Sequence, residues 1–326
     1  MGPLLHRLCA GPGRAAGSDL IPGAPIPGSK PHILVTGASG FAGGHLARLL
    51  AEKGFAVTAP MRRPADAERL RIPGVTMLPG YPPELPSGIA AVVHAAATSA
   101  GPTDRLVADN VDLTARLLDA AATARVRHFI FMSSMSVYGS IAAPEVVETT
   151  PSVDPDVYGT TKRLGEALLA ERCAHPGPER PMTGVAIRLP AVIGAGAARH
   201  WLAVAASRLA AGEEVPVFHP RARFNNAVHV ADLAGLIANI VGGATTGFHA
   251  INVASDGTIT VSEAVEILRH GLKSTSRVRE VATTRPSFVI SIDRARQVFG
   301  FKPMTIAAAL QAYARETAAA AGQGRG

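Results

Sequence analysis

Cysteine, tryptophan and lysine are scarce in this chain, and it has no long apolar run. Its 326 residues include two cysteines, Cys9 and Cys173, and one tryptophan. Two cysteines cannot build a disulfide framework, and no cluster of cysteine and histidine has the spacing of a zinc site. No apolar run approaches the roughly 18 residues that span a bilayer. We therefore expect a cytoplasmic protein without a metal site and without a membrane partner.

Charge is also sparse. Charged residues make up 17% of the chain, and the formal net charge of +7 comes from arginines scattered along it. A basic balance can indicate a nucleic-acid partner, but these arginines form no dense run and no aromatic residues are interleaved with them. We expect no nucleic-acid binding. A mildly positive surface also suits an anionic cofactor and a small-molecule substrate. The 47% of hydrophobic residues is typical of a globular chain, here of one or two domains.

A glycine-rich turn stands between an apolar run and an amphipathic stretch. The run is residues 32–35, glycines recur at 37, 40 and 43, and residues 45–53 are typical of a helix with leucines on one stripe. Strand, glycine-rich turn and helix form the context in which backbone N–H groups bind a pyrophosphate. The pattern predicts a dinucleotide site, although the spacing is G-x-x-G-x-x-G rather than G-x-G-x-x-G.

The residues after the second expected strand, 56–59, indicate which nicotinamide cofactor is used. An acidic residue about 20 positions after the glycines would bind a ribose 2′-hydroxyl. None lies there, whereas Arg62 and Arg63 do. A guanidinium makes charge-assisted bonds to a 2′-phosphate. The sequence therefore favours NADP over NAD.

A tyrosine and a lysine four residues apart indicate acid/base chemistry. On a helix, Tyr158 and Lys162 lie on one face. A phenol titrates near pH ~10, and a neighbouring cation favours the phenolate. The serine pair Ser133 and Ser134 precedes them by about two dozen residues. The pattern predicts proton transfer to or from a substrate hydroxyl or carbonyl.

Other motifs appear in a fixed order. An expected strand motif at 91–97 is rich in small residues. Asn110 lies on an expected helix, and an apolar strand leads into the serine pair. Together with the glycine-rich turn and the Tyr-x-x-x-Lys motif, they resemble the extended short-chain dehydrogenase/reductase family, in its NAD(P)-dependent epimerase/dehydratase branch. The resemblance extends from about His32 to about Leu310.

This resemblance implies roles for individual residues. Tyr158 would be the general acid/base, Lys162 would lower its pKa and hold the nicotinamide ribose, and Ser134 would bind the reacting oxygen. The implied cofactor-binding residues come from the glycine-rich turn, the ends of four strands and the catalytic helix: Gly37, Ser39, Gly40, Phe41, Ala42, Arg62, Arg63, His94, Ala95, Ala96, Ser133, Tyr158, Lys162, Leu189 and Pro190.

Two positions depart from the family pattern. Relatives often place an acid after the third strand, where this chain has Tyr81. Nucleotide-sugar members commonly carry an arginine four residues before the histidine of the segment around His229, and here that residue is Asn225, with Arg223 two residues earlier. Arg223, Asn225 and Ser134 are therefore candidate substrate residues. Either a shifted loop restores the grip on a diphosphate, or the substrate has none.

Strands and helices alternate along the chain, which predicts an α/β fold with a doubly wound parallel sheet of Rossmann type. We expect a flexible tail over residues 1–30, a dinucleotide-binding domain over 31–190, a smaller α/β substrate lobe over 191–316 with an interleaved boundary, and a frayed end over 317–326. By resemblance, helices at 109–125 and 158–170 would form a homodimer interface.

Three functions remain open. The first is an NAD(P)-dependent oxidoreductase that transfers a hydride at a secondary alcohol or ketone, such as a keto-sugar. The second is a nucleotide-sugar epimerase that retains its NAD(P) and recycles the hydride. The third is a non-catalytic NADP-binding sensor, which the presence of both Tyr158 and Lys162 disfavours.

Overall fold

The computed structural model describes residues 30–63, 71, 74–81, 84–175, 181–283 and 286–323. The expected N-terminal tail, with Cys9, lies outside these residues except for Lys30. The C-terminal helix α9 (Ile306–Gln323) continues beyond residue 317, where we expected the chain to fray. Alanine dominates this end, and alanine has the highest helix propensity.

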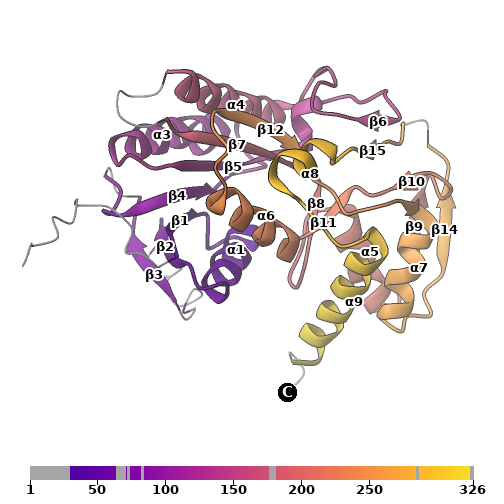
Figure 1. The fold of residues 1–326 in the computed structure, drawn as a ribbon. Coiled ribbons are helices and arrows are strands. Elements are labelled where there is room, and N and C mark those ends of the chain that lie inside the picture. The colour runs from indigo at the N-terminus through magenta and orange to yellow at the C-terminus, as the bar shows by residue number, and fades with distance from the viewer. Residues whose placement is uncertain are drawn as a thin grey trace, which may run out of the picture.

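A seven-stranded parallel sheet forms the centre of the molecule (Figure 1). Its strand order is β12-β7-β5-β4-β1-β2-β3. The bounds are β1 His32–Thr36, β2 Ala56–Met61, β3 Val75–Pro79, β4 Ile89–His94, β5 His128–Ser134, β7 Thr183–Leu189 and β12 Phe248–Asn252. Its central strands are apolar and buried on both faces, as parallel sheets require. The predicted doubly wound Rossmann-type fold is confirmed.

Helices cover both faces of this sheet. One face packs against α1 (Phe41–Glu52), α6 (Val230–Gly242) and α8 (Asp293–Phe299), and the other against α3 (Leu113–Thr123) and α4 (Val157–Ala174). Leu34 and Val35 of β1 illustrate the alternation, since Leu34 belongs to the second core and Val35 to the first. The strand order reverses between β1 and β4, and this switch point is where ligands of such sheets bind.

A smaller lobe follows β7 and has its own apolar core, formed by α5 (Trp201–Ala211), α7 (Val261–Gly271) and α9 (Figure 1). Short strand pairs join its segments to each other and to the main domain. They are β8 (Ala191–Ile193) with β11 (Ala227–His229), β9 (Val215–Phe218) with β14 (Val278–Val281), β10 (Arg223–Phe224) with β13 (Ile259–Thr260), and β6 (Glu145–Val146) with β15 (Val289–Ile290).

Two elements that we expected in the lobe belong to the main domain. β12 pairs in parallel with β7 and completes the sheet, and α6 packs against α1. The boundary near residue 190 is therefore crossed more than once. Three short helices carry site residues: α2 (Thr103–Val107), the π-helix η2 (Ala108–Asp112) and the 3-10 helix η3 (Met135–Tyr138).

Candidate functional site

The glycine-rich turn joins β1 to α1 at the switch point. Gly37 has φ 71°, and a Cβ there would lie 2.6 Å from the backbone nitrogen of Ala96. A Cβ at Gly43 would lie 2.2 Å from the carbonyl oxygen of Gly37. Glycine is therefore required at both positions, because a side chain at either would separate the turn from β4 or from α1. The turn leaves backbone surface at the N-terminus of α1 for a phosphate.

A cavity of about 310 Å³ opens beside this turn. Its lining includes seven of the predicted cofactor-binding residues: Gly37, Ser39, Gly40, Arg62, Arg63, Ala95 and Ala96. It also includes residues that we did not predict as binding residues: Pro60, Tyr81, Ala97, Thr98, Asp109 and Leu113. Small side chains, backbone and two arginines on one surface suit the adenosine and phosphate half of a dinucleotide, so the residues present fit this cofactor.

Asp109 provides this cavity with an acid that we did not predict from the sequence. It lies on η2 rather than at the end of β2, and its Oδ1 atom lies 3.3 Å from Nη1 of Arg62. The Thr98 hydroxyl donates a 2.6 Å hydrogen bond to Oδ2, and this bond, with Arg62 and Arg105 nearby, lowers the pKa of Asp109. Arg62 therefore faces the cavity with part of its charge already balanced.

Tyr81 also lines the cavity, at the position where the family often has an acid. Burial raises the pKa of its hydroxyl, and a hydrogen bond with the backbone of Gly37 acts in the opposite direction. The signal for this residue was present in the sequence, as the departure after the third strand.

The Tyr-x-x-x-Lys motif lies at the start of α4. Asp156 caps this helix by accepting a 2.6 Å hydrogen bond from the backbone nitrogen of Gly159. A Cβ at Gly159 would lie 2.1 Å from the carbonyl oxygen of Ser136, so glycine allows α4 to approach η3 closely. This approach brings the Tyr158 hydroxyl beside Ser134, within reach of a bond that affects its pKa. Burial raises the pKa of Tyr158, whereas the bond to Ser134 lowers it.

Lys162 lies one turn further along α4 and is 2% exposed. Its Nζ atom donates a 2.8 Å hydrogen bond to the carbonyl oxygen of Met132 and lies 5.8 Å from the centroid of the Tyr158 ring. Burial lowers the pKa of Lys162 to about 7, and the charge of Glu166 raises it. The ammonium thus lies under the tyrosine, although its direct partner here is a backbone carbonyl.

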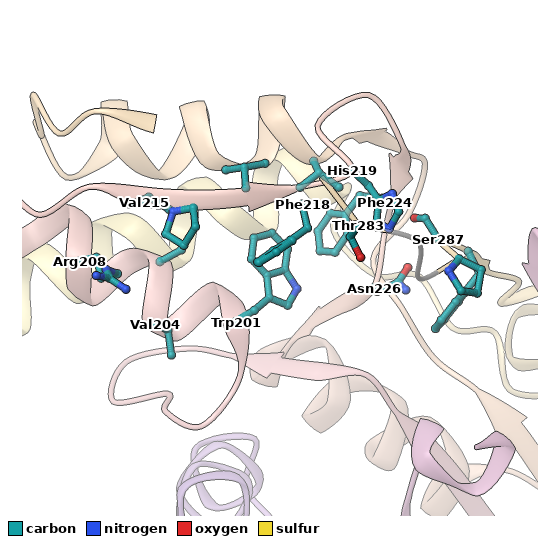
Figure 2. Close-up of a pocket in the computed structure, with 16 residues that line it drawn as sticks. Trp201, Val204, Arg208, Val215, Phe218, His219, Phe224, Asn226, Thr283 and Ser287 are labelled. Atoms are coloured by element: carbon teal, nitrogen blue, oxygen red, sulfur yellow. The ribbon is translucent and has the colours of Figure 1, made fainter. Parts of the chain in front are cut away.

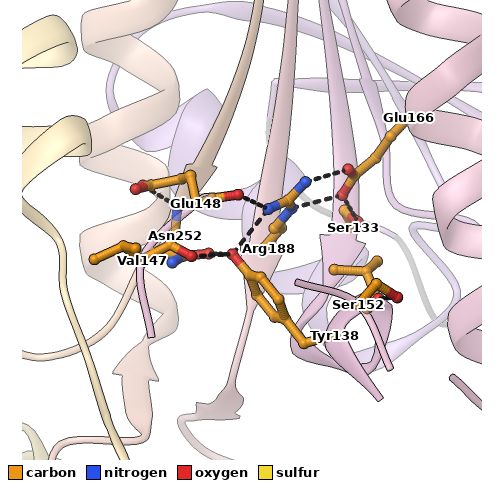
Figure 3. A network of polar contacts seen from close by, with 9 residues as sticks. Ser133, Tyr138, Val147, Glu148, Ser152, Glu166, Arg188 and Asn252 are labelled. Atoms are coloured by element: carbon orange, nitrogen blue, oxygen red, sulfur yellow. Dashed lines mark hydrogen bonds and ion pairs between the residues drawn. The ribbon is translucent and has the colours of Figure 1, made fainter. Parts of the chain in front are cut away.

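A buried polar network supports the serine pair from behind (Figure 3). The Ser133 hydroxyl donates a 2.5 Å hydrogen bond to Oε1 of Glu166. Arg188 donates to both oxygens of Glu166, at 3.0 and 2.7 Å, and to the Tyr138 hydroxyl at 2.8 Å. Tyr138 in turn donates to Asn252 at 2.7 Å. The network links β5, α4, β7 and β12, and its ion pair was not evident from the sequence because its members are far apart in the chain.

Asn110 and His94, two residues of the family motifs, form hydrogen bonds within the protein. Asn110 on η2 accepts from the backbone nitrogen of Thr98 and donates to the Thr161 hydroxyl, which joins the β4 loop to α4. His94 is fully buried, and its two ring nitrogens lie 2.7 and 2.9 Å from the hydroxyls of Thr36 and Thr114. Burial lowers the pKa of His94 to about 3, so the ring is neutral.

The remaining predicted cofactor residues lie around this site. Phe41 and Ala42 form the first turn of α1, and Leu189 and Pro190 follow the sheet at the end of β7. No contact of these four residues tests their predicted role, which stays a prediction.

The substrate lobe contains a separate cavity of about 790 Å³ (Figure 2). It lies between α5, β9 and the segment before β15, and its lining combines aliphatic side chains with the aromatic rings of Trp201, Phe218, Phe224 and Phe288. The predicted substrate residues lie nearby but are engaged elsewhere. Asn225 is buried, donates to the carbonyl oxygen of Ile290 at 2.8 Å and accepts from its nitrogen at 2.9 Å. Arg223 donates to the Thr258 hydroxyl.

The described ranges contain neither a cluster of metal ligands nor a membrane-spanning helix. No group of three or more His, Cys, Asp or Glu side chains there is arranged to hold a metal ion. No helix there combines the length and apolarity that a membrane crossing requires.

Comparison with known proteins gives the same family as the motifs. The model of the NAD dependent epimerase/dehydratase family matches residues 33–254. A UDP-glucose 4-epimerase of Erwinia amylovora is 33% identical over 171 residues, which are 45% of this chain and 50% of that protein. Cinnamoyl-CoA reductase 1 of Petunia hybrida is 33% identical over 147 residues, which are 40% of this chain and 44% of that protein. The chain thus spans about half the length of the curated relatives it matches.

Solved structures share the fold over most of the chain. MoeE5 in complex with UDP-glucuronic acid and NAD has a TM-score of 0.74 at 23% identity, covering 90% of this chain and 99% of that one. A UDP-glucose 4-epimerase of Stenotrophomonas maltophila with bound NAD and formylated UDP-arabinopyranose has a TM-score of 0.74 at 22% identity, with the same coverage. The family model matches more than half of the chain, and its motifs converge on one site. The chain belongs to the NAD-dependent epimerase/dehydratase family.

Proposed function

We propose that this chain reduces a ketone, or oxidises the corresponding secondary alcohol, with a nicotinamide cofactor. One observation carries the proposal. The Tyr158 hydroxyl lies beside Ser134, close enough for Ser134 to lower its pKa, while the ammonium of Lys162 lies on the same side, at the carboxyl end of β5. A phenol, an alcohol and an ammonium that converge in this way are suited to binding and protonating a carbonyl oxygen.

The proposed role of each residue follows from its hydrogen bonding and its protonation state. Bound nicotinamide supplies or accepts the hydride. Ser134 holds the reacting oxygen by a hydrogen bond. Because burial raises its pKa, Tyr158 is a neutral phenol at neutral pH and can donate its proton to that oxygen as the carbonyl is reduced. The charge of Lys162 then stabilises the phenolate that remains.

We also propose that NADP is preferred over NAD. Arg62 and Arg63 line the cofactor cavity directly after β2, and a 2′-phosphate would satisfy a guanidinium there. Asp109 favours the other outcome, since it balances part of the charge of Arg62. Two arginines and one acid line this cavity, so its net charge is positive and favours a ribose that carries a 2′-phosphate.

A nucleotide-sugar epimerase is the second candidate, and the relatives named as UDP-glucose 4-epimerases favour it. The two functions differ in the fate of the cofactor. An epimerase recycles its hydride and keeps its dinucleotide, whereas a reductase exchanges it at each turnover. Native mass spectrometry of the purified full chain separates them. Under the proposal the protein carries no tightly held NAD(P) and takes it up reversibly, and a stoichiometric retained dinucleotide would contradict this.

A homodimer through α3 and α4 is part of the proposal. Val157 and Leu164 of α4 are 44% and 47% exposed, so both are open to contact with a second copy. Sedimentation of the protein and of a Leu164→Glu variant tests this, with dissociation expected only in the variant.

A further inference from the structure

We infer that the substrate, given the reduction proposed above, is a ketone that carries an aryl-sized apolar group and no diphosphate, and that the cavity of the substrate lobe binds that group. The cavity has a volume of about 790 Å³, and small-molecule sites commonly have volumes of roughly 300–1,000 Å³.

Aromatic side chains form the walls of the cavity. The rings of Trp201, Phe218 and Phe224 gather at its middle, with Arg208 toward one end and Asn226 and Ser287 toward the other (Figure 2). Trp201 and Phe224 are in edge-to-face contact, with ring centroids 5.3 Å apart and planes at 77°. Such a wall offers both faces and edges to a planar ring of the ligand.

These side chains are exposed although they are large and apolar. Trp201 is 41%, Val204 52% and Phe218 51% exposed, and all three line this one cavity. Apolar residues scattered singly over a surface need no explanation, whereas a contiguous group indicates a binding surface. An apolar group in the cavity would remove this surface from water.

The charge around the cavity does not suit a diphosphate. Among the described residues that line it, Arg208 is the one arginine, and its Nε atom lies 3.4 Å from Oε2 of Glu213. Asn225 stands where an arginine would grip a diphosphate, and both of its amide atoms are bonded to Ile290. Within the described part of the lining, two negative charges would find no charge-assisted partner that is free of an acid.

Uncharged polar atoms complete the lining. Oδ1 of Asn226 and Nε2 of His219 are buried and have no hydrogen-bond partner among the described residues. A buried polar atom without a partner costs free energy that a ligand hydroxyl or amide can recover. His219 also has a backbone φ of 50°, a conformation that non-glycine residues rarely adopt and that is enriched at ligand sites.

One residue of the cavity lining packs near the segment that follows the serine pair. Phe288 lines the cavity and packs in the same apolar cluster as Met135, the residue directly after Ser134. A ligand whose apolar group lies against Phe218 and Phe288 can therefore present its carbonyl on the side of the serine pair.

The chain has one tryptophan, and it lies in this cavity, so its fluorescence reports on occupancy. The full-length protein is titrated with 4-phenylbutan-2-one and, separately, with UDP and UDP-glucose, in the presence of NADPH. We expect a saturable change in Trp201 emission with the ketone and none with the two nucleotides. Saturation by UDP at equal or lower concentration would overturn the inference.

Two variants of α5 provide a matched pair. Val204→Asp adds a carboxylate to the cavity wall, whereas Ser207→Asp adds one to an exposed position of the same helix outside the lining. We expect Val204→Asp to raise the KM for the ketone about tenfold with kcat little changed, because the charge must be desolvated, and Ser207→Asp to match the parent. Equal effects of the two variants would show that the cavity does not bind the apolar group of the ketone.

The same experiment separates this inference from the proposed function. Ketone binding at Trp201 without NADPH oxidation would contradict the proposed reduction and leave the cavity assignment standing. NADPH oxidation with keto-sugar nucleotides but not with aryl ketones would keep the reduction and overturn the substrate class.

Discussion

The Nζ atom of Lys162 lies 2.8 Å from the carbonyl oxygen of Met132, and this bond joins α4 to the end of β5. Met132 directly precedes the serine pair, so this bond ties the helix that carries Tyr158 to the strand that carries Ser134. The pKa of Lys162 is lowered to about 7 by burial. Its charge therefore changes within the range where enzymes are commonly assayed, and a change at a neighbouring acid should alter the pH dependence of the site.

Replacing Tyr158 with phenylalanine should lower kcat by about 10²-fold or more, because the ring keeps its packing but loses the proton that the carbonyl oxygen needs. Cofactor binding, measured by fluorescence titration with NADPH, should change little. Turnover at the parent rate would show that the proton comes from another group.

Replacing Arg62 with alanine should raise the dissociation constant for NADPH about tenfold and leave that for NADH nearly unchanged, because only NADPH has the 2′-phosphate. Arg48→Ala is the matched control, since Arg48 lies on the surface of α1 and pairs with Glu52. Isothermal titration with both cofactors gives the ratio. An equal loss for NADPH and NADH would contradict the preference.

Glu166→Gln should shift the pH–rate profile to lower pH. The negative charge of Glu166 raises the pKa of Lys162, so its removal lowers that pKa below about 7 and the ammonium is lost earlier as the pH rises. Because the ammonium stabilises the phenolate, the activity lost on the alkaline side should be lost at lower pH in the variant. Folding is checked by circular dichroism, since Arg188 also loses its ion pair.

Glu171→Gln is the control for this shift. Glu171 lies on the same helix, and its side chain is 71% exposed. Its variant should keep the parent profile. A Glu166→Gln profile that is unchanged, or that moves to higher pH, would exclude control of Lys162 by Glu166.

Gly43→Ala should weaken cofactor binding and lower stability by about 1–3 kcal/mol, because its Cβ would lie 2.2 Å from the carbonyl oxygen of Gly37 and force the turn away from α1. Gly235→Ala in α6 meets no atom within 4 Å and should be neutral or stabilising by about 0.5–1 kcal/mol. Urea denaturation of both variants tests the difference. Similar effects of the two would mean that the turn tolerates a side chain.

Local pattern predicted those parts of the fold that depend on neighbouring residues. The β1 run, the glycine-rich turn and the tyrosine and lysine of α4 were recognisable because period, turn geometry and helical spacing act over a few residues. The helix expected at residues 45–53 corresponds to the later part of α1, for the same reason. β12 was placed in the wrong lobe, because the pairing of its Ile251 with Ile187 of β7 joins residues far apart in the chain.

The candidate site divides in the same way. By itself the sequence determined the family, the glycine-rich turn and the pair Tyr158 and Lys162. The turn and the pair are short motifs with their own chemistry, and the order of such motifs indicates the family. Only the tertiary structure decided that Asp109 faces Arg62 and that Glu166 joins Ser133 to Arg188. It also decided that the side chain of Asn225 is hydrogen-bonded to the backbone of Ile290. These contacts depend on how the sheet brings distant segments together. That arrangement is set by burial of the whole core, not by any single stretch of residues.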